Sequence, residues 1–197
     1  MSLSPFPDSP LARAADQLLR TACPPTLVGH SHRTYRFGAA LLDGQRRAFD
    51  AEALFIGAAL HDLALVEPYD DPDTPFELHG SRLAEQELLA GGARPELVEL
   101  VRDAIALHLD IATADDPRPE VAAVHLGAAV DVVGLRLDQL PPALVAEVLE
   151  LHPRQGFSAY VSEVLTGQAK AKPGSKIAAL IQRADFLRLV AAAPFHD

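Results

Sequence analysis

Hydrophobic positions recur at helical spacing along most of the chain. Tyr35, Ala39 and Leu42 fall on one face of a helix expected over 32–44. The stretch 51–65 is apolar nearly all round, which is typical of a helix in the centre of a core. Strict alternation of apolar and polar residues is missing, and no Asn-Gly or Asp-Gly turn joins two β-rich runs. The pattern therefore predicts an all-α fold.

Prolines, glycines and capping residues set the expected helix boundaries. Pro10 opens the first helix behind a cap at Asp8 or Ser9, Asp50 caps the third, and Gly134 ends the sixth. Helices are predicted over 10–19, 32–44, 51–65, 79–89, 95–109, 120–133, 141–151 and 175–192, with a short helix and a loop over 156–174. The acidic, proline-bearing segments 67–75 and 110–119 are expected as loops. Because no domain boundary is visible, residues 1–197 are predicted to form a single-domain helical bundle.

The composition of the chain limits the classes of binding partner that it can have. The formal net charge of −10 argues against a nucleic-acid groove or an anionic membrane surface as the main partner. The longest apolar run, 53–60, is far shorter than the roughly 20 residues of a membrane helix. The first residues carry no basic segment before an apolar one, so a cytoplasmic protein is expected. The single cysteine, Cys23, excludes intrachain disulfides and thiolate zinc clusters. A small molecule is the expected partner, and homo-oligomerisation stays open.

Several histidines and carboxylates stand in apolar surroundings. Asp62 follows His61 and eight apolar residues, and Asp131 lies inside an apolar helix. A carboxylate in such a place costs several kcal/mol unless it is paired, hydrogen-bonded or bound to a cation. Further histidines stand at helix edges or at the end of an apolar run: His32, His79 and His108. Histidine with carboxylate and no thiolate suits zinc, iron, manganese or nickel.

A helix bundle can aim such side chains from separate helices at one point in its core. Adjacent residues on a helix diverge by about 100°, so His61 and Asp62 are expected to converge on one ion only near a helix end or with opposed rotamers. The two oxygens of Asp62 can also bridge two ions.

The order of these residues and the sequence around them resemble the HD superfamily of metal-dependent enzymes, which are all-α. Over roughly 30–134 the chain is similar to the cyanamide-hydratase-like branch of this superfamily. Five short motifs carry this similarity: HSHRTYRFGAAL, AALHDLAL, FELHGSRLA, AIALHLD and VHLGAAVDVVG. The resemblance implies a metal-binding core there, with flanking helices on either side. It implies one or two divalent transition-metal ions, with these ligands: His32, His61, Asp62, His79, His108 and Asp131.

The resemblance also implies a metal-dependent hydrolase or hydratase. A bound divalent ion lowers the pKa of its water towards neutral, so that hydroxide can attack a small, cyanamide-like substrate. His61 and Asp62 are the expected catalytic residues, with Asp62 as a general base if one oxygen is free. Leu65 stands where many phosphohydrolases of the superfamily carry a lysine, which disfavours a phosphoester.

Other interpretations stay open from the sequence alone. They are an HD phosphohydrolase acting on a phosphoester or nucleotide, a di-iron oxygenase, and a non-catalytic metabolite-binding module. Arg33, Arg36 or Arg82 can replace the missing lysine, and His30 is as attractive a ligand as its neighbour His32. The segment 67–75 is expected to be either a lid over the site or an acidic, solvated connector.

Overall fold

The structure is a computed structural model that describes residues 3–195. Within these residues all regular structure is helical, which confirms the predicted all-α class. The helices form one bundle, with these bounds: α1 (Pro10–Ala22), α2 (Pro25–Gly44), α3 (Ala51–Leu60), α4 (Phe76–Ala90), α5 (Pro95–Leu107), α6 (Pro119–Val133), α7 (Pro142–Leu151), α8 (Phe157–Ala171), α9 (Lys176–Arg183) and α10 (Phe186–Ala191). Short 3-10 helices follow α3, α5 and α6: η1 (Leu63–Leu65), η2 (Ile111–Asp115) and η3 (Leu137–Gln139).

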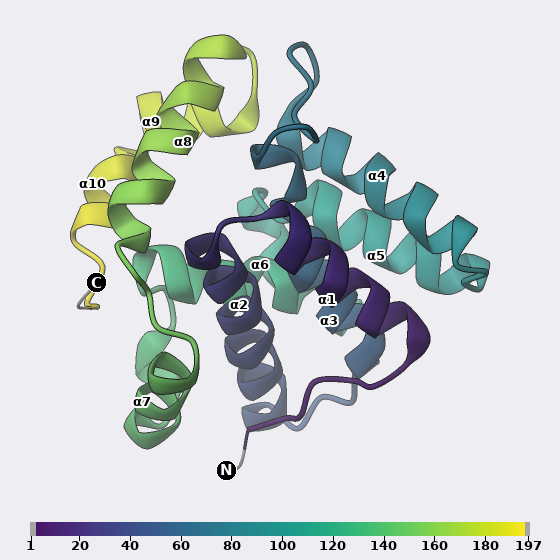
Figure 1. Cartoon of the computed structure of the whole chain (residues 1–197). Coiled ribbons are helices and arrows are strands. Elements are labelled where there is room, and N and C mark those ends of the chain that lie inside the picture. Colours follow the sequence, from purple (N-terminus) through teal and green to yellow (C-terminus); the bar gives the residue numbers. More distant parts are fainter. Residues whose placement is uncertain (1–2, 196–197) are drawn as a thin grey trace.

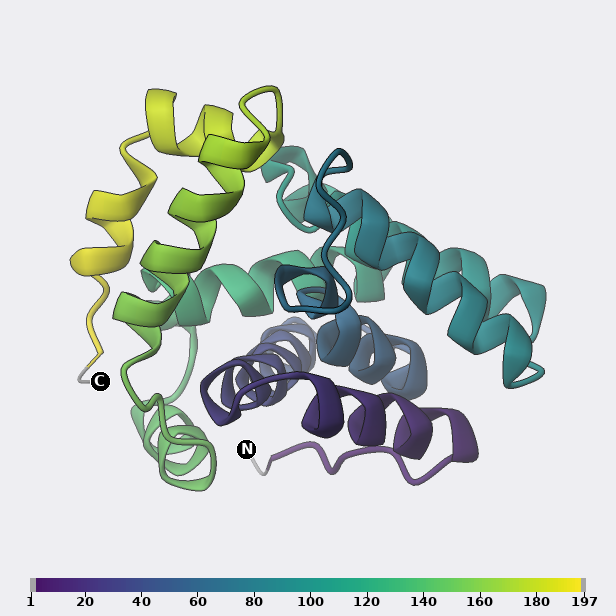
Figure 2. The ribbon, with the colours of Figure 1, turned by 45° about the horizontal axis from the view of Figure 1, so that its top comes forward.

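The centre of the bundle consists of α2, α3 and α6. Every α3 residue from Ala53 to Leu60 is buried, as expected for a helix that is apolar on all sides. In Figures 1 and 2, α1 covers α3, the antiparallel pair α4 and α5 lies on one side, and α8–α10 stand together on the other side. Residues from different parts of the chain therefore meet around α2 and α6.

Helices α2 and α6 pack closely because each has a glycine at the contact. A Cβ atom on Gly127 would lie 2.1 Å from the carbonyl oxygen of Thr34, and one on Gly38 would lie 2.6 Å from that of Ala123. No side chain fits at either distance, so the two backbones touch directly. This contact fixes the distance between α2 and α6, and so the distance that side chains of α2 must span to reach α6.

Most helix ends match the expected signals. Ser9 caps α1 by accepting a hydrogen bond from the Ala12 backbone N–H, and Asp50 caps α3 in the same way. Gly134 ends α6 in the left-handed conformation (φ 73°). Helix α2 begins earlier than predicted, at Pro25, because proline is favoured in the first helical turn.

The prediction of one long last helix over 175–192 is wrong. Asp185 adopts a left-handed conformation (φ 52°) and separates α9 from α10. Aspartate tolerates this conformation better than most residues, and the break turns α10 back along α8. Helix α8 is also longer than the short helix expected over 156–174.

The segment 67–75 contains no regular helix, as predicted. Lys172 of α8 donates to the Asp70 carboxylate at 2.8 Å and ties this loop to the C-terminal helices. No helix of the described chain has both the length and the hydrophobicity of a membrane span.

Candidate metal centre

The His61-Asp62 pair lies where α3 ends. Helix α3 stops at Leu60, His61 keeps helical dihedrals as its C-cap, and Asp62 leaves the helix with φ −109° and ψ 10°. This change of backbone direction lets two adjacent side chains point to the same place, which is the helix-end geometry expected from the sequence.

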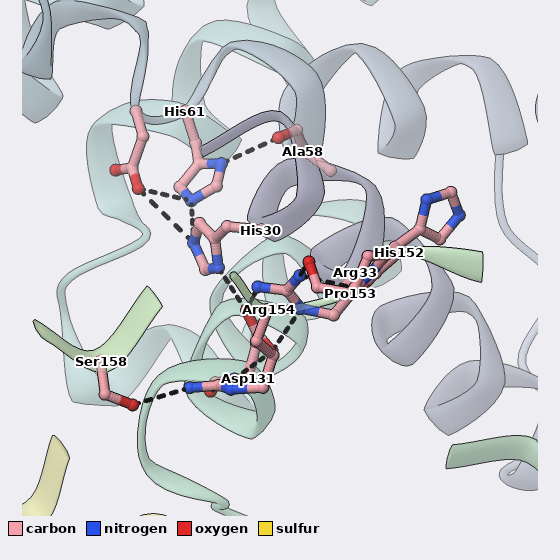
Figure 3. A network of polar contacts seen from close by, with 10 residues as sticks. His30, Arg33, Ala58, His61, Asp131, His152, Pro153, Arg154 and Ser158 are labelled. Atoms are coloured by element: carbon pink, nitrogen blue, oxygen red, sulfur yellow. Dashed lines mark hydrogen bonds and ion pairs between the residues drawn. The ribbon is translucent and has the colours of Figure 1, made fainter. Parts of the chain in front are cut away.

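Three ligand atoms meet there, and all three residues are buried. The Nε2 atoms of His30 and His61 are 3.1 Å apart. The Oδ2 atom of Asp62 lies 3.3 Å from Nε2 of His61 and 3.5 Å from Nε2 of His30. Figure 3 shows the two imidazoles facing each other, with His30 between His61 and Asp131.

The hydrogen-bond partners define which nitrogens carry protons. Nδ1 of His61 lies 2.8 Å from the Ala58 carbonyl, which can only accept, so this nitrogen donates. Nδ1 of His30 lies 2.7 Å from the Asp131 carboxylate and donates to it. In the neutral tautomers, both Nε2 atoms therefore turn lone pairs towards the Asp62 carboxylate.

Three acceptors this close together repel one another unless a cation or an extra proton lies between them. A tetrahedral zinc ion with bonds of about 2.1 Å needs ligand atoms about 3.4 Å apart. The observed separations of 3.1, 3.3 and 3.5 Å fit that requirement. His30, His61 and Asp62 can therefore hold a metal ion.

Asp131 contacts the ring nitrogen of His30 that faces away from His61. It is fully buried, and its carboxylate accepts hydrogen bonds from His30, from Arg33 at 2.7 and 2.9 Å, and from Arg154 at 2.8 Å. Arg154 also donates to the side chain of Ser158 (Figure 3). A carboxylate that orients a ligating histidine is a common arrangement around protein metals.

Asp131 thus differs from the sequence expectation. It was expected to bind the ion directly, yet both of its oxygens are engaged by cations and by the His30 N–H. The structure gives it the role of positioning His30.

Neighbouring charges keep both buried aspartates ionised. Burial alone would raise the pKa of Asp131, but the Arg33 guanidinium and the His30 hydrogen bond hold that pKa well below its usual range. Burial opposes ionisation of Asp62 as well, and the adjacent His61 imidazole lowers the pKa of this carboxyl. The site therefore offers a carboxylate at neutral pH.

The histidines respond differently to the same burial. Burial lowers the pKa of His30 despite its bond to Asp131. Burial would also lower the pKa of His61, but the Asp62 charge outweighs it and raises that pKa. His61 consequently takes up a proton more readily than His30, and a metal ion would compete with that proton.

His108 lies on the other side of Asp62. Its Nε2 is 3.7 Å from Oδ1 of Asp62, while its Nδ1 donates to the Ile105 carbonyl at 2.6 Å. Burial lowers the pKa of His108 to about 3, so the imidazole is neutral. His125 donates from Nδ1 to the His108 carbonyl at 2.7 Å. His108 thus lies beside the cluster, next to the second oxygen of Asp62, and its expected role as a metal ligand stays a prediction.

His32, which is expected from the sequence as a ligand, lies outside the cluster. Its Nε2 lies 2.7 Å from the Asp16 carboxylate of α1, and its ring packs against Phe6. His30 and His32 are two positions apart on α2, so their side chains point about 200° apart and only one can face α6. The structure places His30 there.

The expectation that His79 is a ligand also finds no support. Within the described residues its imidazole contributes no ligand atom to the cluster, and it lies half-buried near Asp71. His79 sits on the first turn of α4, beyond the loop that separates this helix from α3.

From the sequence, His30 is an alternative to His32, Arg33 is considered only as a partner for phosphate, and Arg154 is not identified. The spacing of His30 and Arg33 carried a usable signal. Residues three apart on a helix share a face, so a buried partner such as Asp131 can bind both. Arg154 lies in the link between α7 and α8, and no sequence pattern connects it to α6.

A cavity of about 330 Å³ opens onto the cluster. His30, His61, Asp62 and His108 line its inner end, and apolar residues, most of them from α6 and α8–α10, form its walls. The candidate metal centre can therefore be reached by a molecule larger than water.

No protein-family model matches the chain. Two curated proteins of Saccharomyces cerevisiae, cyanamide hydratase DDI2 and cyanamide hydratase DDI3, are similar to it. Each is 23% identical over 173 residues, which cover 86% of this chain and 77% of the relative. The chain is thus a distant relative of enzymes named for cyanamide hydration, while membership of the wider HD superfamily stays a prediction.

Proposed function

We propose that the protein is a metal-dependent hydratase or hydrolase that adds water to an uncharged carbon–nitrogen multiple bond. The observation that carries this proposal is the convergence of three buried ligand atoms at the inner end of a cavity, 3.1–3.5 Å apart. The distant similarity to cyanamide hydratases supports this reaction class.

His30, His61 and Asp62 would hold the ion, leaving the cavity side open to substrate. A divalent ion bound there would supply a Lewis acid and a water of lowered pKa. Asp131 fixes the orientation of His30, and the Ala58 carbonyl fixes that of His61. Both imidazoles therefore present Nε2 without rotating, which keeps the site preorganised.

Two further lone pairs face the same space. Oδ1 of Asp62 and Nε2 of His108 lie 3.7 Å apart, and both are acceptors. Together they can hold the hydrogens of an attacking water, with Asp62 as the proton acceptor. The other carboxylate oxygen remains with His30 and His61.

The cavity favours an uncharged substrate over a phosphoester. Among the described residues that line it, none is lysine or arginine. Arg33 is fully buried and bound to Asp131, Arg36 lies over the Phe6 ring, and Arg82 is exposed on α4. A phosphate in the cavity would find no lysine or arginine beside the ion to share its negative charge.

The test uses purified metal-free protein, loaded separately with Zn²⁺, Fe²⁺, Mn²⁺ or Ni²⁺. Metal affinity is measured by calorimetry, and conversion of cyanamide to urea is measured by product analysis. His61→Ala should abolish both, whereas His32→Ala, a histidine outside the cluster, should retain both. If no metal binds, or if His61→Ala leaves binding and turnover unchanged, the proposal is wrong.

A further inference from the structure

The walls of the cavity above the cluster are almost entirely hydrocarbon. In the described chain its polar lining consists of His30, His61, Asp62, His108 and His125, and these form one connected group. All remaining lining side chains are aliphatic or phenylalanine. The cavity is therefore polar at the reacting end and apolar everywhere else.

Two separate parts of the chain build most of the apolar walls. Ala129, Val132 and Val133 come from α6, while Val161 and Phe186 come from α8 and α10. The C-terminal helices stand against the end of α6 (Figure 2).

At the mouth, the aliphatic character continues to the surface. Ile111, Leu135 and Leu189 line the cavity and are exposed by 71%, 47% and 42%. An exposed apolar rim around an apolar cavity is typical of a ligand-binding site. A charged or strongly hydrated ligand would lose its water along this path without gaining a partner.

The cavity is much larger than cyanamide. At about 30 Å³ per heavy atom, the three heavy atoms of cyanamide fill less than a third of the space. A dry cavity of about 150 Å³ already holds benzene, and this one measures about 330 Å³. The unfilled volume has the size of a phenyl ring with a short chain.

We propose that the natural substrate carries its carbon–nitrogen triple bond on an uncharged, apolar group of about the size of a phenylalkyl chain. This inference rests on the proposed function. The nitrile lies at the end of the cavity that carries His30, His61 and Asp62, and the apolar group lies between α6 and α8–α10. Water adds across the triple bond: its oxygen bonds to carbon as one carbon–nitrogen π bond breaks, and a carbon–oxygen π bond forms as the second one breaks. Both hydrogens pass from oxygen to nitrogen, and an amide forms without a leaving group or a change of oxidation state.

Binding to the metal-free protein tests the ligand class apart from catalysis. Propanenitrile, pentanenitrile, heptanenitrile and 3-phenylpropanenitrile are titrated by calorimetry, with the cation of 3-aminopropanenitrile as the charged comparison. Affinity should rise about fourfold for each methylene added, and the charged compound should not bind. An affinity that does not change with chain length would overturn the inference.

A pair of variants locates the binding. Ala129→Phe places a ring in the cavity and should weaken 3-phenylpropanenitrile binding about tenfold or more. Ala146→Phe makes the same change on the exposed face of α7 and should bind like the wild type. Circular dichroism melting of both variants confirms that they fold. Equal binding by the two variants would contradict the assigned location.

Turnover by the metal-loaded protein separates this inference from the proposed function. The phenylalkyl nitrile should show the higher kcat/KM. Faster turnover of cyanamide would overturn the substrate class and leave the hydratase function standing. Apolar nitriles that bind in the expected series, with no turnover of any compound, would overturn the hydratase function and still support the apolar ligand class.

Discussion

Helix α2 carries two histidine–aspartate pairs on opposite faces, and they differ in what lies beyond the imidazole. His30 binds Asp131 through Nδ1 and turns Nε2 towards two more acceptors, His61 and Asp62. His32 binds Asp16 through Nε2 and otherwise packs among the rings of Phe6, Phe55 and His152.

The difference shows that a buried histidine–aspartate pair is not in itself a metal site. The Asp16 carboxylate binds Nε2 of His32, and among the described residues no group of three ligand atoms close enough for one ion includes His32. On the α6 face, Asp131 binds Nδ1 of His30, and Nε2 of His30 faces His61 and Asp62. The nitrogen that is left unbound therefore distinguishes the two faces.

The largest expected effect concerns stability. Asp131→Asn removes the charge that Arg33 and Arg154 share in the core, and it should lower the free energy of unfolding by about 3–5 kcal/mol. Asp16→Asn, at a partly exposed pair, should lower it by about 1 kcal/mol or less. Urea denaturation at pH 7 measures both. Similar losses from the two substitutions would mean that the faces do not differ in this way.

The second-largest expected effect is on metal binding, which should depend on His30 and not on His32. His30→Ala removes a ligand atom and should weaken Zn²⁺ binding by about 100-fold or more. His32→Ala should change the affinity less than about threefold, because its nitrogen belongs to Asp16. Calorimetric titration of folded, metal-free protein is the measurement. A His32→Ala variant that no longer binds zinc would return that residue to the site.

Low pH should destabilise the fold through His152, whose ring packs against His32. Burial lowers the pKa of His152 to about 4, and no hydrogen-bond partner for its Nε2 is found among the described residues. The unfolded imidazole takes up a proton below about pH 6.5 and the folded one does not, so stability is full above that pH and is lost as the pH falls towards 4.

His152→Gln removes this titration. The stability of the wild type should drop by about 1 kcal/mol more than that of the variant between pH 7 and pH 5, allowing for partial exposure of the ring. Thermal or urea unfolding at both pH values gives the difference. Parallel pH profiles for the two proteins would place the acid sensitivity elsewhere.

The smallest effect should come from the outer end of the His32 pair. Arg20 donates to Asp16 at 2.7 Å on the surface of α1, and more than half of its side chain is exposed. Arg20→Ala should cost about 0.2–1 kcal/mol, with a smaller cost at high salt. A loss as large as that from Asp131→Asn would show that the two pairs are equivalent.

The helices, and the ends of most of them, followed from the sequence. Proline, glycine and capping residues act locally, so Ser9, Asp50 and Gly134 could be identified without a structure. His61 and Asp62 were found for a similar reason, since two polar residues directly after a long apolar run need a compensating partner. The break at Asp185 was missed because its left-handed backbone depends on how α10 packs.

The rest of the site depends on the relative rotation of helices. A rotation of α2 about its axis by about half a turn decides whether His30 or His32 faces α6. Either rotation buries one histidine beside an acid. Arg154 reaches Asp131 only because the link from α7 to α8 returns to α6. Such contacts are set by tertiary packing, and no local pattern encodes them.

The close contact between α2 and α6 has a consequence for how this protein can diverge. Gly38 and Gly127 lock the two helices that carry His30 and Asp131, so the ligand geometry tolerates little drift. The outer wall of the cavity belongs to α8–α10, beyond that contact. If the proposed function holds, new substrates can therefore be accommodated by changing about the last fifth of the chain, from α8 onward, while His30, His61, Asp62 and Asp131 keep their geometry.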